Sequence, residues 1–589
     1  MPVLTPPKGI FTGYVWNPSI APLDKISAPS HDVMVNENGE VEQRLGYLDT
    51  AIDLGFEGDP VNSSLYIERY DVTAFVVDNS AIALYDWTTG ETFTPSSNLS
   101  GVATTRLAEY AGDLYSTNTT DGLCRIVIGR VNDSAANLGD PNITVDADMA
   151  ARLSRFGITS GDLEWNGNAI GFNAVNVSTG LITLTGTLSD NIPNNALITY
   201  YHDISSGREK FSKVFFWKER MGGFGSISTT NADQPNATEY FGKFAGPDTL
   251  ENIIDFTYGS GGATTELVGK SGSVTNALPA KDYLYTFKET ETYICGAGDV
   301  IISGASIGST PPDLRDENNG CINEDCAAVT GNSEVTYVSP TKRAMMFRIA
   351  TSSGAPVAYP DEKFDRDIRG HLQDMNNDQT GALVTHWKGQ RITIYQLKIG
   401  SQWTWFIYDH KINAWQPPQN LPQASSFFER KGILYFTVPD DDTIYSLFTS
   451  FSDNGNEIDS ELWTGDINVG NSTMLECHAQ GIITQSADIR LQTHVTNQRG
   501  GKQSGSEKHV LGSDFTYSAD FSVGALPVGD APGSSETSQY ATWDKTFDIF
   551  PSEANRVQFS LKQSEDGGYY RLSTYSITYQ PSSHFQKSA

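Results

Sequence analysis

The stretch Gln390-Arg391-Ile392-Thr393-Ile394-Tyr395-Gln396-Leu397 alternates polar and apolar residues. The same period of two recurs in Ser64 to Tyr70, Leu123 to Ile128 and Asp282 to Phe287. Each run is rich in β-branched and aromatic residues and ends near a turn-forming residue, which is the pattern of β-strands. Because hairpin signals such as Asn38-Gly39 separate the runs, the sequence predicts an all-β fold.

Composition narrows the function classes. The 589 residues include 40 Lys and Arg against 71 Asp and Glu, a formal net charge of −31, which excludes a basic nucleic-acid wrapper. Aromatic residues make up 11% of the chain, too many for a disordered acidic protein. The sequence contains five scattered cysteines, no run of 18 apolar residues and no secretory signal pattern at Met1 to Gly9. We therefore expect a folded protein made in a reducing cytoplasm, without membrane insertion.

A repeated phrase between residues 60 and 450 predicts the architecture. A strand ends in a turn, and a second strand carries Tyr or another large aromatic residue before an acidic loop, as in Ala81 to Trp87, Trp405 to Asp409 and Gly432 to Phe436. Blades of a β-propeller need such hairpins, with apolar residues on both faces that pack against neighbouring blades. The phrase predicts a β-propeller, although the repeats are too degenerate to count blades.

Changes in composition divide the chain. The segment Asp146 to Phe156 predicts a helix, with acids in its first turn, Arg in its last turn and Met149, Leu153 and Phe156 on one face. It opens a region rich in Asn, Gly and Thr, and a Gly/Ser-rich region follows Phe451. We predict a β-propeller body at 1–135 and 204–450, an inserted small domain at 136–203, and at 451–589 a C-terminal β-sandwich-like domain or a last blade with an extension.

Two motifs resemble sites but lack their context. Gly304-Ala305-Ser306-Ile307-Gly308 matches a nucleophile elbow, but Pro311-Pro312 stands where that elbow needs a helix, so we expect Ser306 to be chemically idle. Asp374 to Asp378 has the alternate oxygen ligands of a calcium loop. Gln379 occupies the position that needs Gly, so we interpret this stretch as a polar loop with Asx turns.

The remaining candidates are equally incomplete. Cys321 and Cys326 would supply half of a zinc site, and no second pair completes it. The nine histidines show no repeated spacing, and Ser564 to Tyr570 resembles the Asp box of sialidase-type propellers, a structural turn that does not contact substrate. We predict no catalytic, cofactor-binding or metal-binding residue, no cofactor and no enzymatic activity.

Several phrases together resemble one protein family. They are Val35 to Tyr47, with its Asn-Gly turn and Arg44-Leu45-Gly46-Tyr47; Lys213 to Met221; Asp282 to Val300; and Gly320-Cys321 followed by Ala327 to Ser339. In order and rough spacing they are similar to the tail nozzle proteins of short-tailed bacteriophages, also called tail tubular protein B, DNA-stabilisation or tail hub proteins. The likeness spans about residues 30 to 450, with Leu45 where the family typically has Pro and Met221 where Leu is usual.

The resemblance implies a structural role. Members of the family are β-propellers with inserted and C-terminal β domains, and a ring of copies, typically six, continues the DNA channel below the portal and adaptor. The implied partners are further copies of the chain, the head-tail adaptor and other tail proteins such as fibres or a needle. Genomic DNA would pass through the channel without specific binding, and the implied location is the virion tail, assembled in the bacterial cytoplasm.

Two other function classes stay open. One is a receptor-binding or glycan-cleaving tail spike, although the short regular strand period of a parallel β-helix is missing from the sequence. The other is a propeller glycosidase, which needs two carboxylates about 5 to 10 Å apart. The strongly negative charge suits a channel along which DNA slides, but it would equally keep a large protein soluble.

Overall fold

The computed structural model describes residues 3–4, 11–18, 21, 25–133, 136–204, 210–217, 220–225, 238–241, 263–266, 272–281, 283–295, 313–331, 334–350, 357–484, 486–496, 502–514, 540–549, 553–563 and 568–581. Strands dominate these residues, and the predicted all-β class is confirmed. The α-helices among them are α1 (Ala147–Arg155) and α2 (Arg369–Gln373). In the same residues no helix is long and apolar enough to cross a membrane.

Six four-stranded antiparallel sheets contain most of the strands that the structure describes up to Ser450. Five of them each use four strands that are consecutive in sequence, and the sixth takes one strand from near the N-terminus. The sheets are β7 (Val61–Ile67), β8 (Val72–Val77), β9 (Ala81–Asp86) and β10 (Glu91–Phe93); β19 (Lys213–Trp217), β20 (Arg220–Phe224), β21 (Thr238–Phe241) and β22 (Ala263–Glu266); β23 (Val274–Ala280), β24 (Tyr283–Lys288), β25 (Thr292–Cys295) and β26 (Asp313–Asp316); β27 (Ala327–Val329), β28 (Val335–Ser339), β29 (Arg343–Ala350) and β30 (Val357–Pro360); β31 (Leu383–Trp387), β32 (Ile392–Ile399), β33 (Gln402–Asp409) and β34 (Ala414–Trp415); and β35 (Ser426–Arg430), β36 (Ile433–Thr437) and β37 (Ile444–Ser450) with β6 (Gly46–Asp49).

Central strands of these sheets are buried on both faces. In β32 every residue from Ile392 to Leu397 is buried, including the polar residues of the alternating pattern. Gln396 Nε2 donates to the backbone oxygens of Gly381 (2.9 Å) and Ala424 (2.8 Å), so its amide is satisfied inside the protein. The alternation therefore marks a strand between two packed neighbours, with its polar positions hydrogen-bonded.

Neighbouring sheets meet through their first strands. In order along the chain, β7, β11, β19, β23, β27, β31 and β35 each contact the next, and β35 also contacts β7. At that last contact, Ser64 Oγ lies 2.8 Å from Ser426 Oγ, and Phe75 packs edge-on against Phe428. Strand β6 completes the last sheet, with Tyr47 opposite Leu447, so residues from the two ends of this region share one sheet.

The remaining sheet of this region has eight strands. The predicted helix lies in the chain between two of these strands, β14 and β15. Its strands are β11 (Arg106–Tyr110), β12 (Asp113–Asn118), β13 (Gly122–Arg130), β18 (Leu197–Asp203), β15 (Gly161–Trp165), β16 (Asn168–Asn176), β17 (Leu181–Leu184) and β14 (Asn142–Thr144), in that spatial order. The helix prediction is confirmed: Asp146 caps α1, and Met149, Leu153 and Phe156 are buried in one apolar cluster with neighbouring strands.

Segment 136–203 is joined to the preceding strands by its own last strand. β18 pairs with β13 from Cys124 opposite Asp203 to Arg130 opposite Leu197. The apolar residues of the segment also share their cluster with Tyr115, Leu123 and Val127 of β12 and β13. The chain thus leaves the sheet after β13 and returns to the edge of that same strand.

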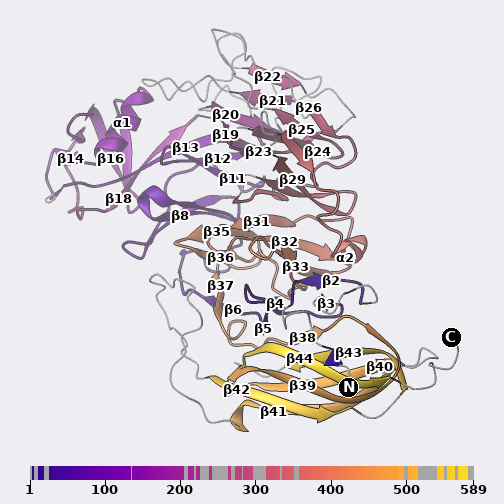
Figure 1. The fold of residues 1–589 in the computed structure, drawn as a ribbon. Helices are drawn as coiled ribbons and strands as arrows, with labels where there is room; N and C mark the ends of the chain where they lie inside the picture. Colours follow the sequence, from indigo (N-terminus) through magenta and orange to yellow (C-terminus); the bar gives the residue numbers. More distant parts are fainter. Residues whose placement is uncertain are drawn as a thin grey trace.

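A ten-stranded sheet system, with seven strands after Ser450 and three from near the N-terminus, forms the lower body in Figure 1. Its strands are β1 (Val3–Leu4), β4 (Val33–Val35), β5 (Val41–Gln43), β38 (Ser460–Trp463), β39 (Ile467–Thr484), β40 (Asp488–Thr496), β41 (Lys502–Leu511), β42 (Tyr540–Asp548), β43 (Glu553–Gln563) and β44 (Tyr570–Pro581). The long strand β39 pairs first with β43 and then with β42 and β44. Phe559 of β43 stacks on Tyr575 of β44 with ring centroids 5.1 Å apart, so side chains of these two strands pack together in the core of the lower body.

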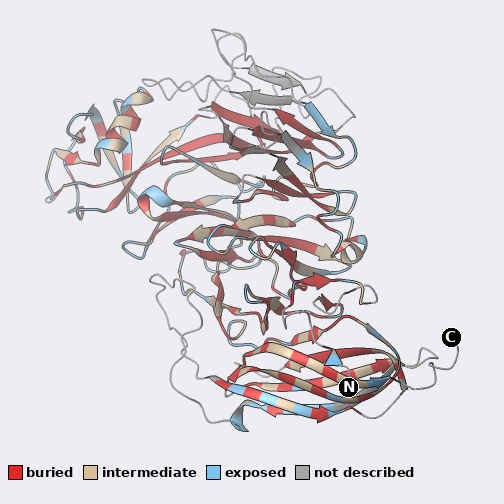
Figure 2. Ribbon diagram, in the orientation of Figure 1, coloured by how far each residue is buried: buried red, intermediate tan, exposed pale blue. Residues whose placement is uncertain are grey.

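Residues near the N-terminus contribute to both bodies. β1, β4 and β5 belong to the ten-stranded system, β6 belongs to the sheet of β35–β37, and the short parallel pair β2 (Tyr14–Val15) and β3 (Ile26–Ser27) lies near them. Figure 2 shows buried residues along the strands of both bodies, while many exposed residues lie in connecting turns. One apolar cluster includes Trp415 from the upper sheets, Val33 and Val41 from the hairpin of β4 and β5, and Tyr575 from the lower body, so the two bodies share part of their core.

Candidate functional site

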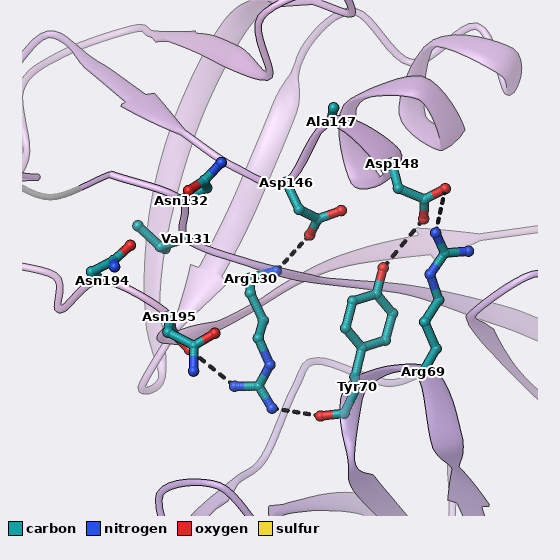
Figure 3. A pocket seen from close by; sticks show the side chains of 10 residues that line it. All are labelled: Arg69, Tyr70, Arg130, Val131, Asn132, Asp146, Ala147, Asp148, Asn194 and Asn195. Carbon is teal, nitrogen blue, oxygen red and sulfur yellow. Dashed lines mark hydrogen bonds and ion pairs between the residues drawn. The ribbon is translucent and has the colours of Figure 1, made fainter.

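A polar pocket of about 590 Å³ lies where the start of α1 meets two sheets (Figure 3). It is lined by residues of the turn η2 (Glu68–Tyr70), the end of β13, the start of α1 and the turn before β18. These residues are Arg69, Tyr70, Arg130, Val131, Asn132, Asp146, Ala147, Asp148, Asn194 and Asn195. Pockets of this size suit small ligands, and the partners of the charged side chains decide what such a pocket can bind.

Arg130 connects the two sheets at this pocket. Its guanidinium donates two hydrogen bonds to the fully buried Asp86 carboxylate, at 2.7 and 2.8 Å. It also donates to the backbone oxygens of Tyr70 (2.5 Å) and Asn195 (2.9 Å), as Figure 3 shows. A forked pair of this kind fixes geometry, so Arg130 positions the strands around it.

The two acids at the start of α1 are bonded within the protein. Asp146 accepts the backbone N–H groups of Met149 and Arg130, both at 2.7 Å, which is the hydrogen-bonding pattern of a helix cap. Asp148 pairs with Arg69 at 2.8 Å and with Arg152 at 2.8 Å, and Tyr70 donates its hydroxyl to it at 3.3 Å. The carboxylates of this pocket therefore anchor the helix.

Arg152 extends the pairing from Asp148 to residues that do not line the pocket. It is ion-paired with Asp113, which also pairs with Arg125 at 2.7 Å, and it donates to the backbone oxygen of Ile128. The guanidinium of Arg125 lies over the ring of Phe156, 3.2 Å from its centroid. Burial raises the pKa of the Tyr70 hydroxyl, which therefore stays protonated at neutral pH. The arrangement is a buried ion network that attaches α1 to two strands.

A second charged cluster lies at the first strands of consecutive sheets. Arg106, at the start of β11, donates to Asp325 at 2.9 and 3.3 Å and lies 3.5 Å from Glu324. Lys213, at the start of β19, lies 4.0 Å from Asp325 and donates to the backbone oxygen of Glu324. Burial alone would raise the pKa of Asp325. The positive charges of Arg106 and Lys213 outweigh this effect and hold the pKa of Asp325 below its usual range. The cluster links the sheets that begin with β11, β19 and β27.

The structure describes one of the two site-like motifs of the sequence, Asp374 to Asp378. Ser306 lies outside the described residues. In the Asp374 to Asp378 stretch, Asn376 Oδ1 accepts the N–H of Asp378 at 2.9 Å, and Asp378 accepts the N–H of Thr380 at 3.0 Å. The predicted Asx turns are confirmed, and no group of three or more potential metal-ligating side chains occurs in the part of the chain that the structure describes.

The two thiols suspected of half a zinc site are buried. Cys321 Sγ donates to the backbone oxygen of Asn323 at 3.1 Å, and Cys326 Sγ to that of Ala382 at 3.2 Å. Burial raises the pKa of Cys321 to about 12, so its thiolate is not available near neutral pH. Of the segment resembling an Asp box, only 568–570 are described.

Sequence spacing missed one histidine pair. Thr393 Oγ1 of β32 lies 3.1 Å from His386 Nδ1 and 2.8 Å from His410 Nε2. Burial lowers the pKa of both imidazoles to about 4, so both are neutral at pH 7. His386 lies on β31 and His410 follows β33, so only the pairing of both strands with β32 brings these side chains together. Only a correct prediction of the register between β31, β32 and β33 would have identified this histidine pair from the sequence.

Comparison with known proteins gives no family. No family model and no curated protein matches the chain. Among solved structures, the computationally designed Ika8 protein has a TM-score of 0.33 at 9% identity over 69% of this chain and 99% of that chain. Raptor of Chaetomium thermophilum has a TM-score of 0.33 at 9% identity (69% and 29%), and U3-55K has 0.31 at 7% (67% and 97%).

Proposed function

We propose that the six four-stranded sheets and strands β11, β12, β13 and β18 are seven blades of a closed β-propeller. The support is the sequence of contacts between first strands, which runs from β7 to β35 and returns to β7. A propeller closes most securely when its last blade combines strands from both ends of the chain. The β35–β37 sheet does so with β6.

We further propose that the chain is a structural protein of a short-tailed bacteriophage, the tail nozzle. In this role a closed ring of copies, six by the family resemblance, continues the DNA channel below the portal and adaptor, retains the packaged genome and lets it leave. The chain would have no catalytic role and would reside in the virion tail.

The observation that carries this proposal is the fastening of both bodies by one short N-terminal segment. Strands β4 and β5 belong to the lower sheet system, β6 belongs to the last upper sheet, and Arg44 lies between them. Arg44 is buried and pairs with Asp32 and Asp453, both at 2.6 Å. A protein that transmits force along a tail needs its domains fixed to one another, and this segment supplies such a connection.

The charge of the chain agrees with passage of DNA without capture. With a net charge of −31 per copy, a ring would repel phosphates on average. In the pocket of Figure 3 the arginines are paired with carboxylates, which leaves their charge largely compensated. DNA that slides through such a ring would meet few uncompensated cations from this site.

The test is reconstitution with the head-tail adaptor of the same phage. The full chain is mixed with adaptor rings, and the products are examined by native mass spectrometry and electron microscopy. We expect a ring of six copies seated on the adaptor with a continuous central channel. A chain that stays monomeric, with the adaptor ring present and intact, contradicts the nozzle proposal.

A further inference from the structure

A seam between two neighbouring sheets, β27–β30 and β31–β34, ends at a histidine. Just before β27, the buried Cys326 Sγ donates to a backbone oxygen across the seam at 3.2 Å. Further along, the buried hydroxyls of Thr336 and Tyr395 lie 2.5 Å apart. After the end of β27, the exposed Gly331 donates its N–H to His386 Nε2 at 2.9 Å. Solvent therefore reaches the seam at the histidine end.

The Gly331 amide determines where the proton of His386 lies. A backbone N–H can only donate, so His386 Nε2 is the acceptor and carries no hydrogen. In the neutral imidazole the proton is then on Nδ1, which lies 3.1 Å from Thr393 Oγ1 and donates to it. The contact across the seam thus exists only while His386 is neutral.

The same reasoning extends to His410. Among the described residues, the two imidazoles are the hydrogen-bond partners of Thr393 Oγ1. This hydroxyl accepts from His386, so it donates its single hydrogen to His410 Nε2 at 2.8 Å. The neutral His410 ring is therefore also protonated on Nδ1. Because Thr393 is fully buried, a chain of three hydrogen bonds with one direction runs through the protein from Gly331 to His410.

The surroundings of this chain disfavour a further positive charge. Lys388 and Arg391, in the turn between β31 and β32, and Arg348 of β29 oppose protonation of the rings. The Tyr408 ring packs edge-on against His410, with centroids 5.0 Å apart. The acids on the neighbouring elements already have partners: Glu334 and Asp361 pair with Arg348, Glu429 accepts the N–H groups of Lys388 and Gly389, and Asp409 accepts those of Lys411 and Ile412.

Protonation of either ring breaks the chain. A proton on His386 Nε2 places two N–H groups against each other at the seam, and Gly331 loses its acceptor. A proton on His410 Nε2 meets the hydroxyl hydrogen that Thr393 directs toward it. A hydrogen bond whose acceptor becomes a donor is lost and its groups repel, so the rings must move apart from their partners.

We propose that this chain, from Gly331 through His386 and Thr393 to His410, is an acid-released latch. In mild acid the histidines take up protons and the seam separates at Gly331, while the Thr336–Tyr395 contact keeps the rest of the two sheets together. The latch does not depend on the nozzle assignment, because it uses only the geometry of two sheets in one chain.

The expected size of the response follows from linkage. Burial lowers the pKa of both rings to about 4 in the latched state, whereas a released imidazole titrates near 6.5. Protons therefore bind the released state more tightly and favour it between these two values. Between pH 7 and pH 5, each histidine should raise the released fraction at least about tenfold.

The first experiment is hydrogen exchange of the full chain at pH 7 and pH 5, followed by mass spectrometry. Protection is corrected for the intrinsic exchange rate at each pH. We expect protection of the Gly331 amide to fall at least about tenfold from pH 7 to pH 5, while the β32 peptide that contains Tyr395 stays protected. A Gly331 amide without protection at pH 7, an unchanged protection, or an equal loss in β32 overturns the latch.

Variants then test whether the histidines cause the response. His386→Gln/His410→Gln cannot titrate in this range, so the ratio of Gly331 protection at pH 7 to that at pH 5 should be close to one. Gln402→Asn, at an exposed position whose side chain does not titrate, is the control and should keep the original ratio. Thermal unfolding checks that each variant is folded. A folded double variant with the original ratio contradicts the proposal.

The proton positions provide an independent test at pH 7. Nuclear magnetic resonance of the full chain labelled with nitrogen-15 in histidine distinguishes imidazoles protonated on Nδ1 from those protonated on Nε2. The single variants His386→Gln and His410→Gln assign the signals, because each removes one ring. We expect both rings to be protonated on Nδ1. Either ring protonated on Nε2 contradicts the directed chain and therefore the latch.

Discussion

Arg44 Nη2 lies 2.6 Å from Asp453 Oδ2, so a residue just before β6 is ion-paired with a residue just after β37. Arg44 Nε also lies 2.6 Å from Asp32 Oδ1, and Asp32 accepts the N–H of Asn420 at 2.9 Å. Segments about 400 positions apart in sequence therefore share one buried charge network. This network sits where the strands of the upper and lower bodies join.

Replacing Arg44 should destabilise that junction. Arg44→Met leaves the buried carboxylate of Asp453 without its cation and leaves Asp32 paired with His31 alone, a change that typically costs about 3 to 5 kcal/mol. We expect a matching fall in the free energy of unfolding, measured by urea denaturation at pH 7. Arg366→Met is the control, because the Arg366 side chain is 71% exposed beside Asp367, and it should change stability by less than about 1 kcal/mol. Equal stabilities of the two variants would contradict a structural role for Arg44.

The His386–His410 pair should make the protein sensitive to mild acid. Burial lowers the pKa of both residues from 6.5 to about 4 in the folded state, so the unfolded chain binds more protons between these values. The contribution of the two neutral imidazoles to the free energy of unfolding is therefore complete above about pH 6.5, and it is lost as the pH drops toward 4. Nearby Lys388, Arg391 and Arg348 act in the same direction, because each opposes a further positive charge.

The measurement is the unfolding free energy at pH 7 and pH 5. After allowance for partial solvent screening, each histidine should contribute a loss of roughly 1 kcal/mol. The double variant His386→Gln/His410→Gln should lose less stability over the same interval. Gln402→Asn, at an exposed position whose side chain does not titrate, is the control and should keep the original pH dependence. An unchanged pH dependence in the double variant would exclude this pair as the acid-sensitive element.

The Arg106–Asp325–Lys213 cluster should matter for cohesion between sheets. Asp325→Ala leaves two cations close together without their shared carboxylate; because the Asp325 side chain is 38% exposed, solvent screens the cluster, and we expect a loss of roughly 1 kcal/mol in unfolding free energy. Hydrogen exchange should speed up first at β11, β19 and β27, the strands that the cluster connects. Asp190→Ala, in an exposed turn, provides the comparison. A uniform increase in exchange over all sheets would indicate general destabilisation instead of local release.

Local sequence signals predicted single elements well. Alternation identified strands such as β32, and the acids and Arg residues around Met149 and Leu153 identified α1, because both patterns depend on neighbours within one turn or one strand. Pairing between distant strands left no such signal. Tyr47 lies opposite Leu447, and nothing in either local pattern specifies the other. The His386–His410 pair depends on this kind of long-range register, so it could not be predicted from the sequence.

The last prediction concerns the segment between β13 and β18. Val131 and Asn195 lie side by side, since the N–H of Asn195 donates to the Val131 oxygen at 2.7 Å. The N–H of Val131 in turn donates to the Ala196 oxygen at 2.9 Å. Replacing 132–195 by Asn-Gly should therefore close a direct β13–β18 hairpin, because these two residues favour a tight turn.

Two deletions separate the roles of the segment. Removing 132–195 keeps β18 on the edge of β13, so we expect the remaining sheets to fold, with reduced stability because Tyr115, Leu123 and Val127 lose apolar cover. Removing 140–203 also removes β18 and exposes the hydrogen-bonding edge of β13, and we expect aggregation or failure to fold. Circular dichroism and size-exclusion chromatography of both variants provide the measurement. If the chain lacking 140–203 folds as well as the chain lacking 132–195, β18 is dispensable and the segment beginning at 136 is an independent domain that includes it.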